Sequence, residues 1–132
     1  MLAADDPTRI IGVLDWELAT VGDPLMDLGS ALAYWIEGTD PLPLRLLRRQ
    51  PTHLPGMLTR AEVVARYFEK SGRVPERFTF YEVYGLFRLA VIAQQIYYRY
   101  HHKQTRNPAF RWFWLFVAYL AWRTDRILSE RG

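Results

Sequence analysis

The apolar positions of this chain follow two spacings, a short run near the start and longer helical patterns after it. Residues 10–14 (Ile-Ile-Gly-Val-Leu) are rich in β-branched side chains, which predicts a short, largely buried strand. Asp-Asp-Pro-Thr at 5–8 is typical of a turn, so we expect a hairpin whose first strand lies at or before Leu2. An unpaired edge of that hairpin would favour self-association into a homo-oligomer.

The first helical pattern follows a proline. Asp23 suits the N-cap and Pro24 the first helical position, and the apolar spacing predicts a helix over 24–37. Asp27 falls in the first turn, where the helix dipole favours a carboxylate by about 0.3–1 kcal/mol. We interpret Asp23 and Asp27 as structural residues rather than catalysts.

Three further helices are predicted from start signals. Thr59 and Glu62 form a capping box that opens a helix over 60–71, which Gly72 ends. Thr79 and Glu82 predict a second box, opening a long helix to about residue 103. Asn107-Pro108 then begins a helix to about 129, and these last two are expected to pair as an antiparallel hairpin. The proline-rich segment 38–57 is expected to be a loop with one helical turn at 44–49.

Composition excludes several classes of protein. With 132 residues, half of them apolar, the chain can bury the core of one domain. It has no Cys, which excludes a disulfide scaffold and a Cys-ligated zinc site and fits a reducing, cytoplasmic environment. The longest apolar run, 112–122, is shorter than the ~20 residues that span a bilayer, so a buried helix is expected, with an interfacial membrane helix as the alternative.

Charge is divided unequally along the chain. Residues 1–40 hold eight acids and Arg9 alone as a base, whereas the rest holds 16 bases and six acids. An acidic segment favours a divalent metal, and a basic body favours anionic partners.

Aromatic side chains concentrate in the last two predicted helices. Their helical spacing predicts that most lie in the core, although a base-stacking platform is the alternative. The adjacent His101 and His102 point about 100° apart on a helix, so a solvated helix end is favoured over a shared metal. The aromatic residues are Phe78, Phe80, Tyr81, Tyr84, Phe87, Tyr97, Tyr98, Tyr100, Phe110, Trp112, Phe113, Trp114, Phe116, Tyr119 and Trp122.

Asp15 is the candidate for chemistry because it follows the predicted strand directly. A carboxylate there can reach a ligand, and Mg²⁺ commonly takes one or two protein carboxylates and fills its other positions with water and phosphate. The competing interpretation is a turn Asp that binds nearby backbone amides. No role can be assigned to Glu17.

A family resemblance starts from these residues. Val-Leu-Asp-Trp-Glu at 13–17, Gly-Asp-Pro at 22–24 and Asp-Leu at 27–28 resemble a segment of aminoglycoside-phosphotransferase-like small-molecule kinases. The resemblance is to the branch associated with acyl-CoA dehydrogenases. It implies that Asp15 is the magnesium ligand that bridges the ATP phosphates. It also implies that residues 1–132 form the C-terminal helical lobe of a protein-kinase-like α+β fold, here mainly α with a small N-terminal β hairpin.

The resemblance also implies parts that this chain lacks. The general-base Asp and a metal-binding Asn of such kinases lie on a catalytic loop before the metal Asp, and residues 1–8 contain no such pattern. We therefore expect the catalytic loop to precede Met1. Mg²⁺ and ATP are expected in the intact enzyme, whereas this chain alone is expected to bind neither tightly and to be inactive.

The expected partner is a small molecule with a hydroxyl group. Since acids are scarce after Asp40, an anionic substrate is favoured over a polycationic aminoglycoside. The resemblance places Arg88, Gln95, Tyr98 and Arg99 toward a substrate groove. No nucleic-acid or membrane partner is expected. The rival interpretation is a non-enzymatic helical module for protein interaction.

Overall fold

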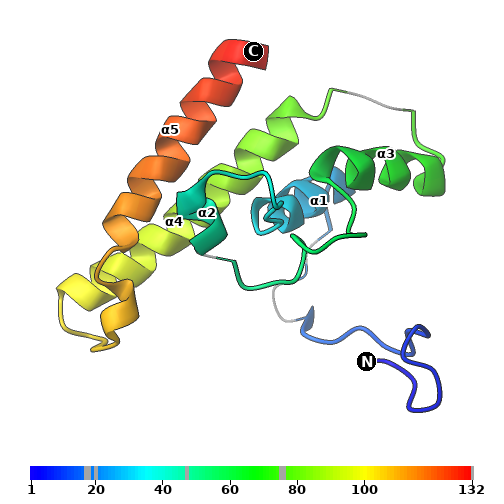
Figure 1. The fold of residues 1–132 in the computed structure, drawn as a ribbon, viewed down its shortest axis with the longest axis horizontal. Helices are drawn as coiled ribbons and strands as arrows, with labels where there is room; N and C mark the ends of the chain where they lie inside the picture. The colour runs from blue at the N-terminus through cyan, green and yellow to red at the C-terminus, as the bar shows by residue number, and fades with distance from the viewer. Residues whose placement is uncertain (17–18, 20, 47, 75–76, 132) are drawn as a thin grey trace.

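The chain is mainly helical in the computed structural model, which describes residues 1–16, 19, 21–46, 48–74 and 77–131 (Figure 1). Three helices precede the long pair: α1 (Pro24–Ala33), α2 (Leu42–Leu46) and α3 (Arg60–Ser71). The pair itself is α4 (Thr79–His101) and α5 (Phe113–Arg131), with the short 3₁₀ helix η2 (Pro108–Phe110) between them. The mainly α class predicted from the sequence is confirmed.

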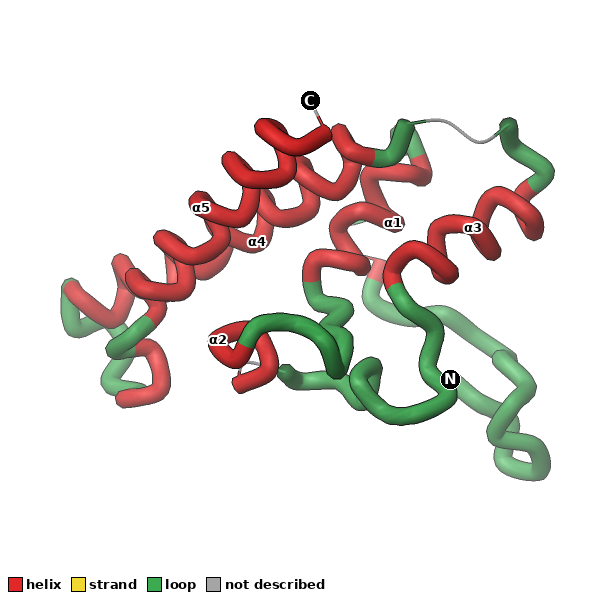
Figure 2. The backbone as a smooth tube through the Cα atoms, turned by 45° about the horizontal axis from the view of Figure 1, so that its top comes forward, coloured by secondary structure: helices red, strands yellow, loops and turns green. Residues whose placement is uncertain are grey.

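Helix α4 is the centre of the packing. It contacts α1 along one side and α5 along the other, and α4 and α5 run side by side as the predicted hairpin (Figure 2). Apolar residues of α4 and α5 meet between them, which removes their surface from water and stabilises the pair. The buried members of this cluster are Leu86, Leu89, Leu120 and Ile127.

Two glycines allow α1 and α4 to cross closely. A Cβ atom at Gly29 would lie 2.1 Å from the carbonyl oxygen of Tyr81, and one at Gly85 would lie 2.1 Å from the carbonyl oxygen of Gly29. No side chain fits at these distances. The crossing therefore depends on glycine at both positions.

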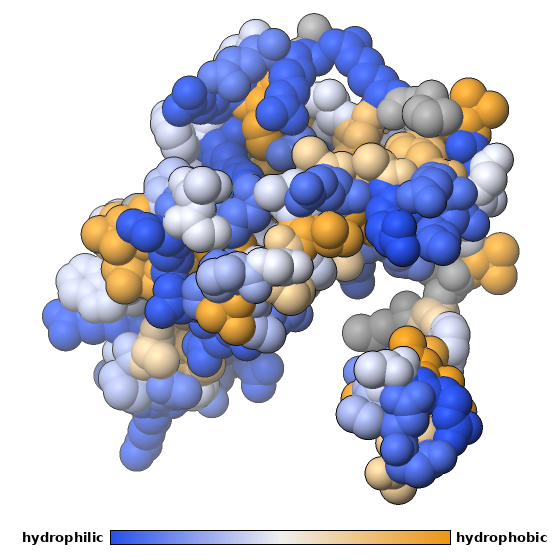
Figure 3. Space-filling view, turned by 45° about the vertical axis from the view of Figure 1, so that its right-hand side comes forward, coloured by the Kyte–Doolittle hydropathy of each residue, from blue (hydrophilic) through white to orange (hydrophobic). Residues whose placement is uncertain are grey.

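Residues 1–16 form an N-terminal arm that stands beside the helices (Figure 3). Its two halves pair through an isolated antiparallel bridge between Leu2 and Ile10, with a hydrogen bond of 2.9 Å from Ala3 N to Arg9 O. The described residues contain no regular strand. The prediction of a buried strand is wrong, because no described helix covers the arm and Ile10 and Leu14 are 70% and 66% exposed.

Of the two capping boxes predicted from the sequence, one is present in the structure. The Thr59–Glu62 capping box is present and Gly72 ends α3 in the left-handed conformation. The second box is absent: α4 begins after Phe78 without a side-chain cap, and Glu82 pairs instead with Arg131.

Other boundaries differ by a few residues. Helix α1 ends at Ala33 rather than 37, and the turn in the proline-rich loop is α2, two residues earlier than expected. Asn107 caps η2, since its side chain accepts a hydrogen bond from Ala109 N, and α5 starts only at Phe113.

The aromatic side chains lie nearer the surface than predicted. Trp112 and Trp114 are 57% and 46% exposed, and Trp122 is also exposed. Leucine and isoleucine fill the space between α4 and α5, which leaves the larger rings at its margins. Phe68 is the one buried aromatic residue in the described part of the chain. No described helix is long and apolar enough to cross a membrane.

Candidate functional site

Asp15 lies in the last turn of the N-terminal arm. Its backbone has a positive φ of 71°, a conformation that Asp adopts more readily than most residues. The indole Nε1 of Trp16 donates a 2.8 Å hydrogen bond to the carbonyl oxygen of Val13, which closes the turn around Asp15. The side chain is exposed, and no hydrogen bond or ion pair to another described residue occupies its carboxylate. Its oxygens are therefore available to an external ligand.

The donor set around Asp15 fits one part of a magnesium site. Mg²⁺ needs only one or two carboxylates from the protein when phosphates and water supply the rest. The described residues contain no group of three or more potential ligands that could hold an ion alone. The competing interpretation, a turn Asp that binds local amides, stays open, because the amides of residues 17 and 18 lie outside the described residues. Glu17 lies outside the described residues.

Asp23 has a defined structural position at the start of α1. One carboxylate oxygen accepts a hydrogen bond from Leu25 N at 3.0 Å, and the other accepts from the Tyr81 hydroxyl at 2.6 Å. The Tyr81 hydroxyl and then the Leu25 amide lower the pKa of Asp23. Asp23 thus joins the N-terminus of α1 to α4, while Asp27 lies exposed in the first turn.

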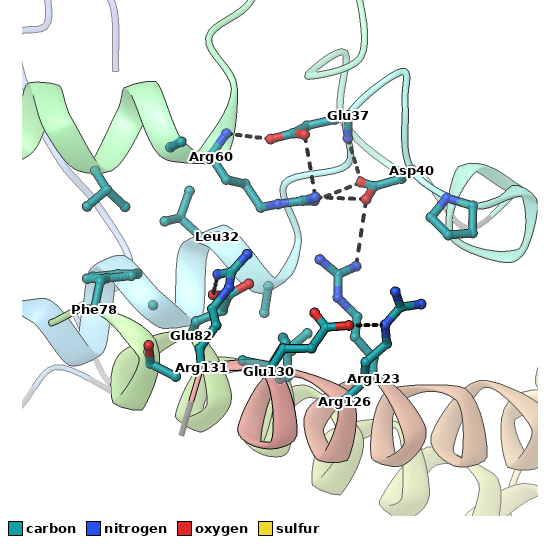
Figure 4. A pocket seen from close by; sticks show the side chains of 18 of the residues that line it. Leu32, Glu37, Asp40, Arg60, Phe78, Glu82, Arg123, Arg126, Glu130 and Arg131 are labelled. Atoms are coloured by element: carbon teal, nitrogen blue, oxygen red, sulfur yellow. Dashed lines mark hydrogen bonds and ion pairs between the residues drawn. The ribbon is translucent and has the colours of Figure 1, made fainter.

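A cleft of about 650 Å³ opens between α1, α3, the start of α4 and the second half of α5 (Figure 4). Charged side chains of both signs line it beside the rings of Phe78, Tyr119 and Trp122. Asp15 is not among the residues that line this cleft. The charged residues are Glu37, Asp40, Arg60, Glu82, Arg123, Arg126, Glu130 and Arg131.

Arg60 and Asp40 form the most buried ion pair of the cleft. The two terminal nitrogens of Arg60 donate to the two oxygens of Asp40 at 2.7 and 2.8 Å, the bidentate geometry that makes such pairs strong. Burial alone would raise the pKa of Asp40, but the hydrogen bonds from Arg60 and Glu37 N and the charges of Arg60 and Arg123 outweigh it and lower this pKa. The pair fixes the start of α3 to the loop after α1.

The opposite wall of the cleft also consists of paired charges. Arg131 contacts Glu82 at 3.1 Å, and Arg126 contacts Glu130 at 2.7 Å. The Arg126 guanidinium also lies 5.6 Å from the ring centre of Trp122. The cleft therefore holds four acids and four arginines that pair with one another, so its charges balance.

Sequence reasoning missed this cleft. Its walls come from segments spread over residues 29–131. Arg60 and Asp40 are twenty positions apart, and no helical or strand periodicity predicts that they pair. Of the four residues expected at a groove, Arg88 lines a separate cavity of about 200 Å³ and bonds the Ser30 hydroxyl at 3.1 Å. Gln95, Tyr98 and Arg99 line none of the cavities described for this chain.

The two adjacent histidines lie at the exposed end of α4. Their ring centres are 5.3 Å apart at a steep angle, and His102 Nδ1 lies 2.9 Å from the carbonyl oxygen of Tyr98. This arrangement agrees with a solvated helix end.

Comparison with known proteins gives matches in sequence. Residues 1–75 match the phosphotransferase enzyme family. Mouse acyl-CoA dehydrogenase family member 10 is 36% identical over 96 residues, which cover 71% of this chain and 9% of the relative. Mouse acyl-CoA dehydrogenase family member 11 is 36% identical over 99 residues, which cover 70% of this chain and 12% of the relative. A probable acyl-CoA dehydrogenase of Arabidopsis thaliana is 32% identical over 95 residues, which cover 69% of this chain and 12% of the relative.

The chain thus spans about a tenth of the length of the curated relatives it matches. No solved structure gives a significant match.

Proposed function

Because the chain belongs to the phosphotransferase enzyme family, we propose that it is the C-terminal lobe of an ATP- and Mg²⁺-dependent kinase that phosphorylates a hydroxyl group of a small molecule. The observation that carries this proposal is Asp15. It is an exposed carboxylate without a described partner, and it lies in a turn that the Trp16–Val13 hydrogen bond closes.

Asp15 would hold Mg²⁺ through a carboxylate oxygen. Bound there, the ion would supply charge neutralisation for the phosphates of ATP, which together with positioning accounts for most of the rate in phosphoryl transfer. The task of this chain is to place that oxygen. The turn at residues 13–16 fixes the Asp15 backbone, and the Asp23–Tyr81 hydrogen bond fixes the helix that follows.

The charges of the helical body support an anionic substrate. No acid occurs between Glu82 and Asp125, and the acids of the cleft are engaged by arginine. The curated relatives bear the name acyl-CoA dehydrogenase. We therefore propose a hydroxyacyl-CoA as the first anionic alcohol to test.

The 132-residue chain alone is proposed to be inactive. The general base and the second metal ligand of the family are expected before Met1, and removing groups that act as a unit costs several orders of magnitude. Asp15-dependent phosphoryl transfer by the isolated chain would contradict this.

The test uses the kinase that contains this segment with its upstream residues. Asp15→Asn should lower kcat about a thousandfold or more with a hydroxyacyl-CoA, because the metal loses a charged ligand. Asp125→Asn is the control, since Asp125 is also an exposed aspartate but lies on α5, and it should retain activity. Preferential phosphorylation of aminoglycosides would exclude the anionic substrate. Absence of Mg-ATP binding by the whole protein would favour the rival, a helical interaction module.

A further inference from the structure

The end of the α4–α5 hairpin that connects the two helices forms a positively charged surface. We call residues 98–115 the hairpin tip; Figure 1 shows it at the far end of the two helices from α3 and from the N-terminal arm. Its cations are exposed, and none forms an ion pair with a described acid. The nearest acids in the sequence, Glu82 and Asp125, belong to the opposite half of the hairpin. The four cations are Arg99, Lys103, Arg106 and Arg111.

Apolar side chains emerge among these cations. Trp112, just before α5, and Trp114 and Leu115, in its first turn, are exposed although burial was expected there. Leu115 is 47% exposed, and Tyr98 projects from the end of α4. Behind them, the rings of Phe110 and Phe113 contact edge to face at 5.2 Å and brace the turn. The tip therefore presents apolar groups on an ordered support with cations around them.

We propose that the hairpin tip docks on the surface of an anionic lipid bilayer. Tryptophan and tyrosine favour the boundary between headgroups and acyl chains, and leucine favours the acyl side of it. Lysine and arginine beside them bind anionic headgroups, each contributing to attraction at the surface. The proposed contact is with the bilayer surface.

A bilayer suits the tip better than single-stranded nucleic acid does. Nucleic acid would use the flat faces of aromatic rings for base stacking. One face of Trp112 is covered by the Arg111 guanidinium at 5.1 Å, and the Tyr98 ring lies 4.0 Å from the tilted ring of His102. Leu115 has no stacking face, whereas hydrocarbon accommodates its side chain and the ring edges.

Vesicle sedimentation tests the proposal with the 132-residue chain. We expect binding to phosphatidylcholine vesicles that contain roughly one third phosphatidylserine, no binding to pure phosphatidylcholine, and weakening as salt rises. Arg99→Gln with Arg106→Gln should lower the partition coefficient about fivefold per charge, or about 25-fold together. Trp112→Ser with Trp114→Ser should also reduce binding and abolish a blue shift of tryptophan fluorescence on vesicles.

The control is Arg48→Gln with Lys70→Gln, which removes the same charge from exposed sites outside the tip. Circular dichroism of each variant verifies that the helices persist. Three results would overturn the proposal: no binding to anionic vesicles at low salt, equal loss of binding in the control, or binding of single-stranded RNA instead of vesicles with the same dependence on the tip residues.

Discussion

Three aspartates of this chain show how contacts decide the role of a carboxylate. Asp15 is exposed without a described partner, Asp23 accepts from an amide and a tyrosine hydroxyl, and Asp40 is 7% exposed and held by Arg60. The first is free to bind a ligand, whereas the other two are committed to the fold. Charge alone therefore does not identify the functional acid.

Removal of Arg60 should destabilise the protein. Arg60→Leu would leave the buried Asp40 carboxylate without its bidentate partner, and breaking such a pair costs about 3 kcal/mol in the free energy of unfolding. Urea denaturation measures this change. Arg66→Leu breaks the exposed Arg66–Glu69 pair and should cost less than about 1 kcal/mol. Equal effects of the two substitutions would contradict the importance of the buried pair.

Stability should fall at acid pH partly through Asp40. Because its pKa is lower in the folded state than in the unfolded chain, its contribution is complete above the unfolded value, about 3.8, and is lost as pH falls through the folded value. Thermal unfolding between neutral and strongly acid pH measures this. Asp40→Asn should be less stable at neutral pH and should show a flatter decline below about pH 4. If stability declined with pH as steeply in Asp40→Asn as in the unchanged protein, the acid sensitivity would come from other carboxylates.

At the scale of the residue, the sequence predicts only contacts that are local. The cap of α1 by Asp23 follows from the Asp-Pro pair, which places the carboxylate beside the first free amides. The bond from Tyr81 to Asp23 joins residues 58 positions apart, and no spacing rule reveals it. The metal role of Asp15 stays a prediction, since it depends on a family resemblance and on ligands from outside the described residues.

At the scale of the element, the α1–α4 crossing is set by backbone contact rather than by side chains. Gly29→Ala would put a methyl group against the Tyr81 carbonyl in the first turn of α4, where both groups belong to helical backbone. We expect a loss of about 3 kcal/mol in the free energy of unfolding, the upper range for overpacking. Gly22→Ala is the control, because nothing lies within 4 Å of its Cβ position. Chemical denaturation that shows equal stability for both variants would contradict the close crossing.

Both the helix from Arg60 and the helix from Thr79 were predicted, but the predicted capping box is present only in the first. Thr59 and Glu62 bond each other's backbone, so the sequence and the structure agree for α3. Thr79 and Glu82 have the same spacing, but Glu82 pairs with Arg131, which lies 49 positions away. A distant partner replaced the local one, and this is why the same pattern gave two outcomes.

At the scale of the whole molecule, the helical body and the N-terminal arm differ in what covers them. The body buries leucine and isoleucine between α4 and α5, so periodicity predicts its architecture. The arm carries apolar residues that periodicity assigns to a buried strand, yet no described element packs on them. A strand is buried only if another element packs against it, and the apolar pattern of the strand does not show whether such an element is present.

The exposed arm should make the isolated chain self-associate. Its Leu2–Ile10 bridge leaves unpaired backbone groups at the edges, beside exposed apolar side chains that include Ile10 and Val13. A second arm can pair with such an edge, and lysine there opposes pairing through charge and solvation. Light scattering coupled to size-exclusion chromatography should show a mass that rises with concentration and returns to that of a monomer in Ile10→Lys with Val13→Lys. Val74→Lys changes an exposed apolar residue outside the arm and should not alter the mass. A monomer at every concentration, or equal dissociation by the Val74 variant, would show that the arm edge does not drive association.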